Sequence, residues 1–277
     1  MLNILFWNIN RNKNEDYIAR CVAEHNVDVA VFAEFREKNS KAMVIDCAAI
    51  ENALGKMYVW ITGVEAAGKV LLLAKRSISV EQIQQESRYS CYVIETAIKR
   101  YILAAVHLED RQNYPEPYRR IETIGALVQD IRKNEESLEI ENSIVIGDFN
   151  ANPYDVELLY KRAFNAVLFK SIIEENEYTN PKGDRIKRFY NPILNYLSEE
   201  TKMYGSHYYD GSDKRPTSYW HCLDQVLLRK SLVSFLAEVN YLKEIDGTEL
   251  LSGTSLNKKI SDHLPLLVKL LEVGNGT

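Results

Sequence analysis

Residues 143–150 read S-I-V-I-G-D-F-N, an apolar run that ends in a carboxylate and an amide. Short runs of β-branched residues are typical of strands that are buried on both faces. Asp148 stands where this run ends, and rigid strands aim the side chains at their ends into one crevice. The alternative is a plain turn, because Gly, Asp and Asn are residues that turns prefer. The stretch therefore predicts a buried strand with a candidate site at its end.

The same arrangement recurs along the chain. Apolar runs predict further strands over residues 2–9, 27–34, 101–108, 222–228 and 264–271. Polar signatures lie at or beside these strands: Trp7-Asn8-Ile9-Asn10, Ala33-Glu34-Phe35-Arg36, Val106-His107-Leu108-Glu109, Leu223-Asp224-Gln225 and Ser261-Asp262-His263. Hydrolysis of a phosphate ester requires oxygen ligands for a hard cation, a base that works near neutral pH, and donors to the phosphate. The collected carboxylates, amides and imidazoles supply these parts.

The order of the predicted elements indicates the fold class. Helical spacing predicts helices beginning near residue 15, over 41–55, over 117–134 and from residue 153, whereas residues 176–219 are predicted to be irregular. The helices are too few to place one between every pair of strands. The pattern therefore favours two packed sheets with helices outside them over a fully parallel sheet. We expect residues 1–277 to form a single domain.

Composition limits the classes of function. The formal net charge of −5 argues against a globally basic nucleic-acid binder, although a bound metal and a local basic patch can offset acidic surface elsewhere. None of the four cysteines forms a Cys-x-x-Cys pair, so a thiolate zinc site is not expected. No leader segment and no apolar run of membrane-spanning length is seen. The sequence predicts a cytoplasmic protein without a membrane anchor.

With these motifs in this order, the chain resembles the endonuclease/exonuclease/phosphatase superfamily. Its members include DNase I-like nucleases, abasic-site endonucleases, sphingomyelinases and inositol polyphosphate 5-phosphatases. The resemblance covers Asn8 to His263 and implies an α/β fold, a four-layer α/β/β/α sandwich. It also implies a divalent-metal-dependent phosphoesterase that uses Mg²⁺, with Mn²⁺ as an alternative. The implied substrate is nucleic acid or a phosphorylated small molecule.

The resemblance assigns roles residue by residue. Glu34 matches the family's metal-ligating glutamate, with Asn8 and Asp262 as further metal contacts. The residues that match the catalytic set are Asp148 and Asn150 beside the attacked phosphate, the carboxylate–histidine pair Asp224 and His263, and His107. The glutamate that orients the first histidine in the DNase I branch has no clear counterpart in residues 65–70. The role of His107 is therefore left open between general acid and phosphate donor.

Residues outside these motifs are candidates for substrate contact. Arg36 follows the metal-ligating glutamate by two positions, as in the DNase I-like arrangement. Segment 176–219 mixes cations with aromatic residues, and such a loop suits phosphates and stacked bases. The alternative is a solvated loop whose rings pack beneath it. The candidates in this segment are Lys182, Arg185, Lys187, Arg188, Tyr208 and Trp220.

Three functions remain open from the sequence. The first is a metal-dependent nuclease in which Asp148 and His263 activate water and Glu34 holds the metal. The second is a phosphomonoesterase or lipid-headgroup hydrolase with the same site. The 5-phosphatase signature around the aspartate differs from residues 219–225, Y-W-H-C-L-D-Q, which lowers the case for inositol phosphates. The third is a catalytically silent binding module on the same fold, against which the complete residue set argues.

Overall fold

Two large mixed sheets dominate the computed structural model, which describes residues 1–35, 41–61, 70–111, 113–179, 185–209 and 219–272. In this described part, the first sheet has the order β16 (Leu236–Tyr241), β21 (Leu266–Leu270), β1 (Leu2–Asn8), β2 (Val29–Ala33), β4 (Val70–Lys75) and β3 (Tyr58–Trp60). The second has the order β5 (Ser79–Gln85), β6 (Tyr89–Glu95), β7 (Arg100–His107), β8 (Ser143–Asp148), β15 (Asp224–Leu228), β12 (Phe189–Tyr190) and β9 (Ala166–Val167).

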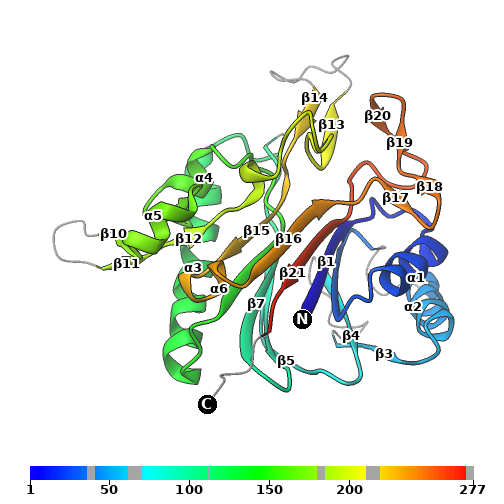
Figure 1. Cartoon of the computed structure of the whole chain (residues 1–277), viewed down its shortest axis with the longest axis horizontal. Coiled ribbons are helices and arrows are strands. Elements are labelled where there is room, and N and C mark those ends of the chain that lie inside the picture. The colour runs from blue at the N-terminus through cyan, green and yellow to red at the C-terminus, as the bar shows by residue number, and fades with distance from the viewer. Residues whose placement is uncertain (36–40, 62–69, 112, 180–184, 210–218, 273–277) are drawn as a thin grey trace.

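Helices cover the outer faces of these sheets (Figure 1). The first sheet is flanked by α1 (Glu15–Glu24) and α2 (Lys41–Ala53). The second is flanked by α3 (Pro117–Leu138), α4 (Val156–Leu159), α5 (Lys170–Glu175) and α6 (Lys230–Val233). The predicted four-layer α/β/β/α sandwich is thereby confirmed. No helix in the described residues is both long enough and apolar enough to cross a membrane.

Strand β8 shows why its sequence is a continuous apolar run. Ile144 and Ile146 belong to the main core, which contains residues of both sheets. Val145 belongs to a second core that includes the buried face of α3. Successive side chains of a strand point to opposite faces, so a strand with helices on one side and a sheet on the other has no solvent-facing position.

Backbone pairing brings the polar strand ends to one region. Strands β1 and β2 run parallel, with Asn8 opposite Ala33, so Glu34 follows directly beside Asn8. Strand β8 lies between β7 and β15, and Asp148 is in register with His107 on one side and with Asp224 on the other. Asp148 is therefore central to the candidate site before any side-chain contact is considered.

Several short elements lie where the sequence predicts irregular structure. Segment 176–219 contains the hairpin β10 (Tyr178–Thr179) and β11 (Ile186–Lys187), strand β12, a 3₁₀ turn (Ile193–Asn195), and β13 (His207–Tyr209) paired with β14 (Tyr219–His221). That prediction is wrong at these positions because such short strands carry too few residues for a visible periodicity. Two further hairpins are β17 (Glu244–Ile245) with β18 (Thr248–Glu249), and β19 (Leu251–Ser252) with β20 (Ser255–Leu256).

Gly147 allows the close approach of β8 to β7. A Cβ built on this residue, whose φ is +154°, would lie 2.0 Å from the carbonyl oxygen of Val106. We expect Gly147→Ala to lower the free energy of unfolding by at least about 2 kcal/mol, since the clash is with backbone and can be relieved only by moving a central strand. Urea unfolding followed by circular dichroism measures this loss.

Gly55 offers the matched control. It also has a positive φ, but a Cβ there meets no atom within 4 Å. Gly55→Asn should change the free energy of unfolding by less than about 1 kcal/mol, because asparagine tolerates the left-handed region. Equal unfolding midpoints for Gly147→Ala and the wild type would contradict the close-packing argument.

Candidate active site

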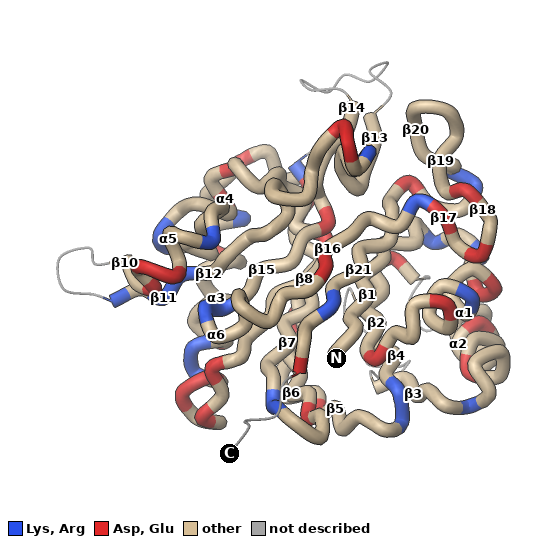
Figure 2. The backbone as a smooth tube through the Cα atoms, viewed as in Figure 1, with Lys and Arg blue, Asp and Glu red and all other residues tan. Residues whose placement is uncertain are grey.

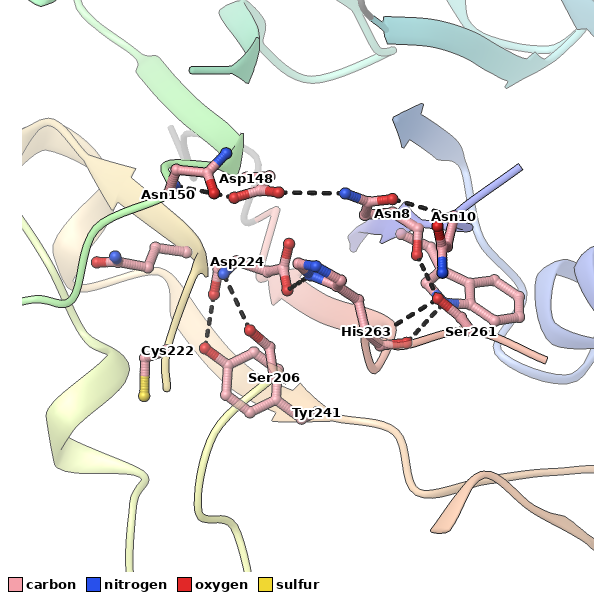
Figure 3. A network of polar contacts seen from close by, with 12 residues as sticks. Asn8, Asn10, Asp148, Asn150, Ser206, Cys222, Asp224, Tyr241, Ser261 and His263 are labelled. Carbon is pink, nitrogen blue, oxygen red and sulfur yellow. Dashed lines mark hydrogen bonds and ion pairs between the residues drawn. The ribbon is translucent and has the colours of Figure 1, made fainter. Parts of the chain in front are cut away.

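Asn8 joins the ends of the two sheets. Its amide Nδ2 donates to Asp148 Oδ2 at 3.1 Å (Figure 3). Glu34 Oε1 lies 3.4 Å from the same nitrogen. Its Oδ1 accepts a hydrogen bond from the backbone N–H of Asn10. Asn8 therefore positions a carboxylate from each sheet, and its predicted direct contact with a metal stays a prediction.

Glu34 lies in a turn just after β2, and a backbone hydrogen bond holds it there. It follows β2 with a φ of +49°, and its carbonyl oxygen accepts a hydrogen bond from the N–H of Arg11. Arg11 Nε also lies 3.8 Å from Glu34 Oε2. The left-handed conformation of a non-glycine residue is uncommon and is found often at functional sites. The turn directs the carboxylate away from the apolar strand and towards Asn8.

The sequence G-D-F-N provides both a turn and a site. Asp148 ends β8 with its side chain buried, and its Oδ1 accepts a hydrogen bond from the backbone N–H of Asn150 at 2.9 Å. Asn150 has a φ of +48° and donates its Nδ2 to the carbonyl oxygen of Leu108. The turn thus also fixes the carboxylate of Asp148, because a backbone N–H of the turn donates a hydrogen bond to it.

Asp224 and His263 form a buried pair. His263 Nδ1 lies 2.7 Å from Asp224 Oδ2, and Figure 3 shows the pair beside Asp148. The surrounding backbone is fixed by three hydroxyls: Ser206 Oγ accepts from the N–H of Asp224, Ser261 Oγ accepts from the N–H of His263, and Tyr241 donates to the carbonyl oxygen of Asp224. Asp224 and His263 are therefore hydrogen-bonded to each other, and the backbone of each residue is held by neighbouring hydroxyls.

Burial and mutual charge set the electrostatics of the site. Burial is the main reason that the pKa of Asp148 is raised to about 7, and repulsion from Asp224 adds to it. Burial alone would lower the pKa of His263, but the charge and hydrogen bond of Asp224 outweigh burial and raise this pKa to about 10. A carboxyl that titrates near neutral pH suits proton transfer, and a charged imidazole suits donation to an anionic phosphate.

His107 lies against both carboxylates. Its Nε2 is 3.6 Å from Glu34 Oε1 and 3.9 Å from Asp148 Oδ2, distances that suit electrostatic attraction but exceed a good hydrogen bond. Of residues 65–70, in which the orienting glutamate has no clear counterpart, residues 65–69 lie outside the described part of the chain. The geometry places His107 where it can donate to a phosphate bound between Glu34 and Asp148.

A hard cation fits beside Glu34. The Glu34 side chain is 28% exposed, so its carboxylate can be reached from solvent. Mg²⁺ in proteins usually takes one or two carboxylates and keeps several waters, so a single open glutamate with a second carboxylate nearby suffices. The described residues contain two sets with three potential ligand atoms within 4.8 Å of one another. These sets are Asp148, Asp224 and His263, and His207, Asp262 and His263; neither includes Glu34.

The predicted substrate-contacting arginines that belong to the described residues, Arg185 and Arg188, make contacts away from this site. Arg36 and Lys182 lie outside the described residues. Arg185 stacks on the Tyr178 ring at 4.0 Å, and Arg188 donates to Thr179 and to the carbonyl oxygen of Asn176. Both belong to the β10–β11 hairpin, which projects at the left edge of Figure 1, away from β13 and β14. Their contact with substrate stays a prediction.

The predicted aromatic contacts lie on one face of a hairpin. Tyr208 and Trp220 pair across β13 and β14, and both are half-buried against the main core. Side chains alternate between faces, so His207, Tyr209 and His221 point to the opposite face. Stacking of a base on Tyr208 or Trp220 also stays a prediction.

Some contributors were not singled out by sequence patterns. Arg11 lies beside Glu34, while Ser206 and Tyr241 hold the backbone of Asp224. Ser261, which holds the backbone of His263, belongs to the S-D-H signature, but the signature assigns it no role. Arg11 follows the W-N-I-N signature directly, so proximity in sequence could have indicated it. The roles of the hydroxyl residues could not be found in this way, because these residues act through backbone contacts that only the folded chain creates.

The whole chain between residues 5 and 263 matches the model of the Endonuclease/Exonuclease/phosphatase family. The protein therefore belongs to this family, whose members act on phosphoester bonds. No curated protein sequence matches the chain.

Solved structures share the fold. Truncated TDP2 of Caenorhabditis elegans superposes with a TM-score of 0.57 at 15% identity, covering 96% of each chain. The 3′ phosphatase NExo from Neisseria, bound to a product DNA hairpin, gives a TM-score of 0.56 at 14% identity and covers 98% of this chain and 100% of that chain. An AP endonuclease from Archaeoglobus fulgidus gives 0.57 at 14% identity, covering 98% and 99%. At such identities the likeness shows the fold alone.

Proposed function

We propose that this protein is a divalent-metal-dependent nuclease that hydrolyses a phosphodiester of nucleic acid with an activated water. The observation that carries the proposal is the position of Asp148. This buried carboxylate is bridged to Glu34 by Asn8 and has both His107 and the Asp224–His263 pair around it. A carboxylate, two imidazoles and a second, open carboxylate around one point form the donor and acceptor set that phosphoester hydrolysis requires.

Glu34 is the residue that we propose to hold the metal, with Asn8 positioning its carboxylate, whereas a contact of Asp262 with this metal stays a prediction from the resemblance. When bound, Mg²⁺ or Mn²⁺ would neutralise charge on the phosphoryl oxygens. The preference for these ions follows from the oxygen ligands that Glu34 supplies.

Each remaining side chain has a proposed task. Asp148 orients the attacking water and accepts its proton, since burial has already raised the pKa of this carboxyl. His263, kept charged by Asp224, donates from Nε2 to a phosphoryl oxygen. His107 donates to the phosphate or protonates the leaving oxygen. Asn150 acts mainly through its backbone N–H, which holds Asp148.

Nucleic acid is the proposed substrate class because the similar structures include proteins bound to DNA. One is the Neisseria 3′ phosphatase with a product DNA hairpin, and another is Danio rerio TDP2 complexed with a single-strand DNA product. Figure 2 shows acidic and basic residues interspersed in this view, so the contacts that bind the phosphate backbone must be local. A cytoplasmic location, which the free cysteines favour, is part of the same proposal.

The test uses four substrates under one set of conditions. Supercoiled plasmid, a labelled oligonucleotide, the same oligonucleotide with a 3′-phosphate, and a chromogenic phosphomonoester are incubated with Mg²⁺ or with a chelator. We expect cleavage of nucleic acid that disappears on chelation and returns with added Mg²⁺. Glu34→Gln should be inactive at every Mg²⁺ concentration while unfolding at the wild-type urea concentration.

Other outcomes assign another function. Turnover of the phosphomonoester or of the 3′-phosphate without cleavage of the chain would identify a phosphomonoesterase. Turnover of sphingomyelin or a phosphoinositide alone would identify a lipid-headgroup hydrolase. Full activity in the chelator would contradict the metal assignment, and inactivity on all substrates would favour a binding module.

A further inference from the structure

His263 also belongs to a second group of potential metal ligands. His207, Asp262 and His263 each offer one ligand atom, and these atoms lie within 4.8 Å of one another. The rings of His207 and His263 are 4.5 Å apart between centroids. His207 begins β13, whereas Asp262 and His263 precede β21, so segments more than 50 residues apart in sequence meet here.

Backbone contacts hold this group in place. His207 and His263 form an antiparallel β-bridge, and the N–H of Leu264 donates to the carbonyl oxygen of Ser206 at 2.8 Å. Both histidines are buried, at 8% and 6% exposure, while Asp262 is half-buried. The backbone therefore holds the three ligands together, and Asp262 is the most exposed of them.

The ligand types select a class of metal. Two imidazoles and one carboxylate suit Zn²⁺ and related transition-metal ions such as Co²⁺ and Ni²⁺, whereas Mg²⁺ prefers oxygen ligands and more of them. Asp224 occupies Nδ1 of His263, which leaves Nε2 as the nitrogen for a metal. A carboxylate on the other ring nitrogen is the arrangement that orients metal-binding histidines in zinc proteins.

We propose that His207, Asp262 and His263 form a transition-metal site, separate from the cation site at Glu34, and that Zn²⁺ bound there inhibits the enzyme. Inhibition follows because the metal takes Nε2 of His263, the nitrogen that the catalytic reaction uses as a donor. Binding of the metal depends only on the three ligands, whereas inhibition rests on the proposed function. Zn²⁺ must displace the proton of the charged ring, which passes to solvent, and imidazole is too poor a ligand for Mg²⁺ to cause the same displacement.

His207 is the residue to change, because it has no proposed part in hydrolysis. His207→Phe keeps an aromatic ring against His263 and removes the ligand nitrogens. Loss of an outer contact to a metal ligand typically lowers affinity by about 10- to 100-fold, so loss of a ligand should lower it at least tenfold. We expect Mg²⁺-dependent turnover within about threefold of the wild type, with the Zn²⁺ concentration for half inhibition raised at least tenfold.

His207→Cys is the matched variant, because a thiolate is also a zinc ligand. It should retain inhibition by Zn²⁺ near the wild-type concentration. Equal inhibition of wild type and His207→Phe would overturn the proposal. So would inhibition that added Mg²⁺ relieves competitively, because Zn²⁺ would then act at Glu34.

Binding is measured separately from activity. Co²⁺ titration, followed by its visible absorption without substrate, should show one site in the wild type and in the inactive Glu34→Gln variant, and a greatly weakened site in His207→Phe. Co²⁺ binding to a protein that cleaves none of the substrates would reject the proposed function and retain the metal site. Absence of Co²⁺ binding in an active enzyme would reject the metal site and retain the function.

Discussion

Replacing Asp148 by asparagine is expected to lower kcat by about 10²- to 10⁴-fold, the range found when a general base is removed. Asparagine matches aspartate in size and still offers one oxygen to the N–H of Asn150, so the turn should persist. It cannot accept a proton from water. Steady-state rates on a labelled oligonucleotide at saturating Mg²⁺ measure the loss.

Stability should respond in the opposite direction. Burial and Asp224 raise the pKa of Asp148, so the folded protein binds a proton there more tightly than the unfolded chain does. Stability is therefore lost as the pH rises from about 4, where this carboxyl ionises in the unfolded chain, to the folded pKa of about 7, and the loss is complete above that pH. In a chelator at pH 8, Asp148→Asn should unfold at a urea concentration equal to or above that of the wild type. A strongly destabilised variant would assign Asp148 a structural role.

Asp28 provides the control carboxylate. It lies at the opposite end of β1 and β2 from the site, where it accepts the N–H of Asn3 and pairs with Lys75. Asp28→Asn should lose stability, because these contacts weaken, and retain kcat. The same change from aspartate to asparagine should therefore lower kcat at position 148 and lower stability at position 28. Retained activity in Asp148→Asn would contradict its assignment as the base.

The Asp224–His263 pair is expected to behave as one unit. Asp224→Asn and His263→Ala should each lower kcat by about 10²- to 10⁴-fold, and the double variant should be little worse than the worse single variant. The carboxylate orients the ring and favours its charged form, so removing it disables the histidine as well. Losses that multiply in the double variant would show that the two residues work independently.

A Tyr241 variant distinguishes the effect of the Asp224–His263 pair from the effect of the backbone that supports it. The Tyr241 hydroxyl donates to the carbonyl oxygen of Asp224, not to the carboxylate. Tyr241→Phe removes this hydrogen bond, together with the contacts of the hydroxyl to Cys222 and Ser206, and should cost about 0.5–1.5 kcal/mol of stability, with less than a tenfold loss in kcat. A loss as large as that of Asp224→Asn would mean that backbone position, and not the carboxylate, controls His263.

Much of the architecture could be predicted from local patterns. The runs that became β1, β2, β7, β8 and β21 are apolar because both faces of these strands are covered, and each carries its polar residue at or beside an end. Edge strands were not predicted. Strand β5 reads S-V-E-Q-I-Q-Q and is partly exposed, so its pattern resembles that of a loop.

The sequence by itself determined which residues could perform the chemistry, because a carboxylate, amide or imidazole beside a buried apolar strand stands out from its neighbours and needs a partner or a function. Tertiary structure alone decided which of them meet. Asn8 reaches from one sheet to a carboxylate of the other, and His107 at the end of β7 lies against Glu34 because the two sheets pack on each other. Period-two alternation separates Tyr208 from His207 but does not say which of them faces the site. That choice depends on the β-bridge between His207 and His263, a backbone contact across 56 residues that no local pattern encodes.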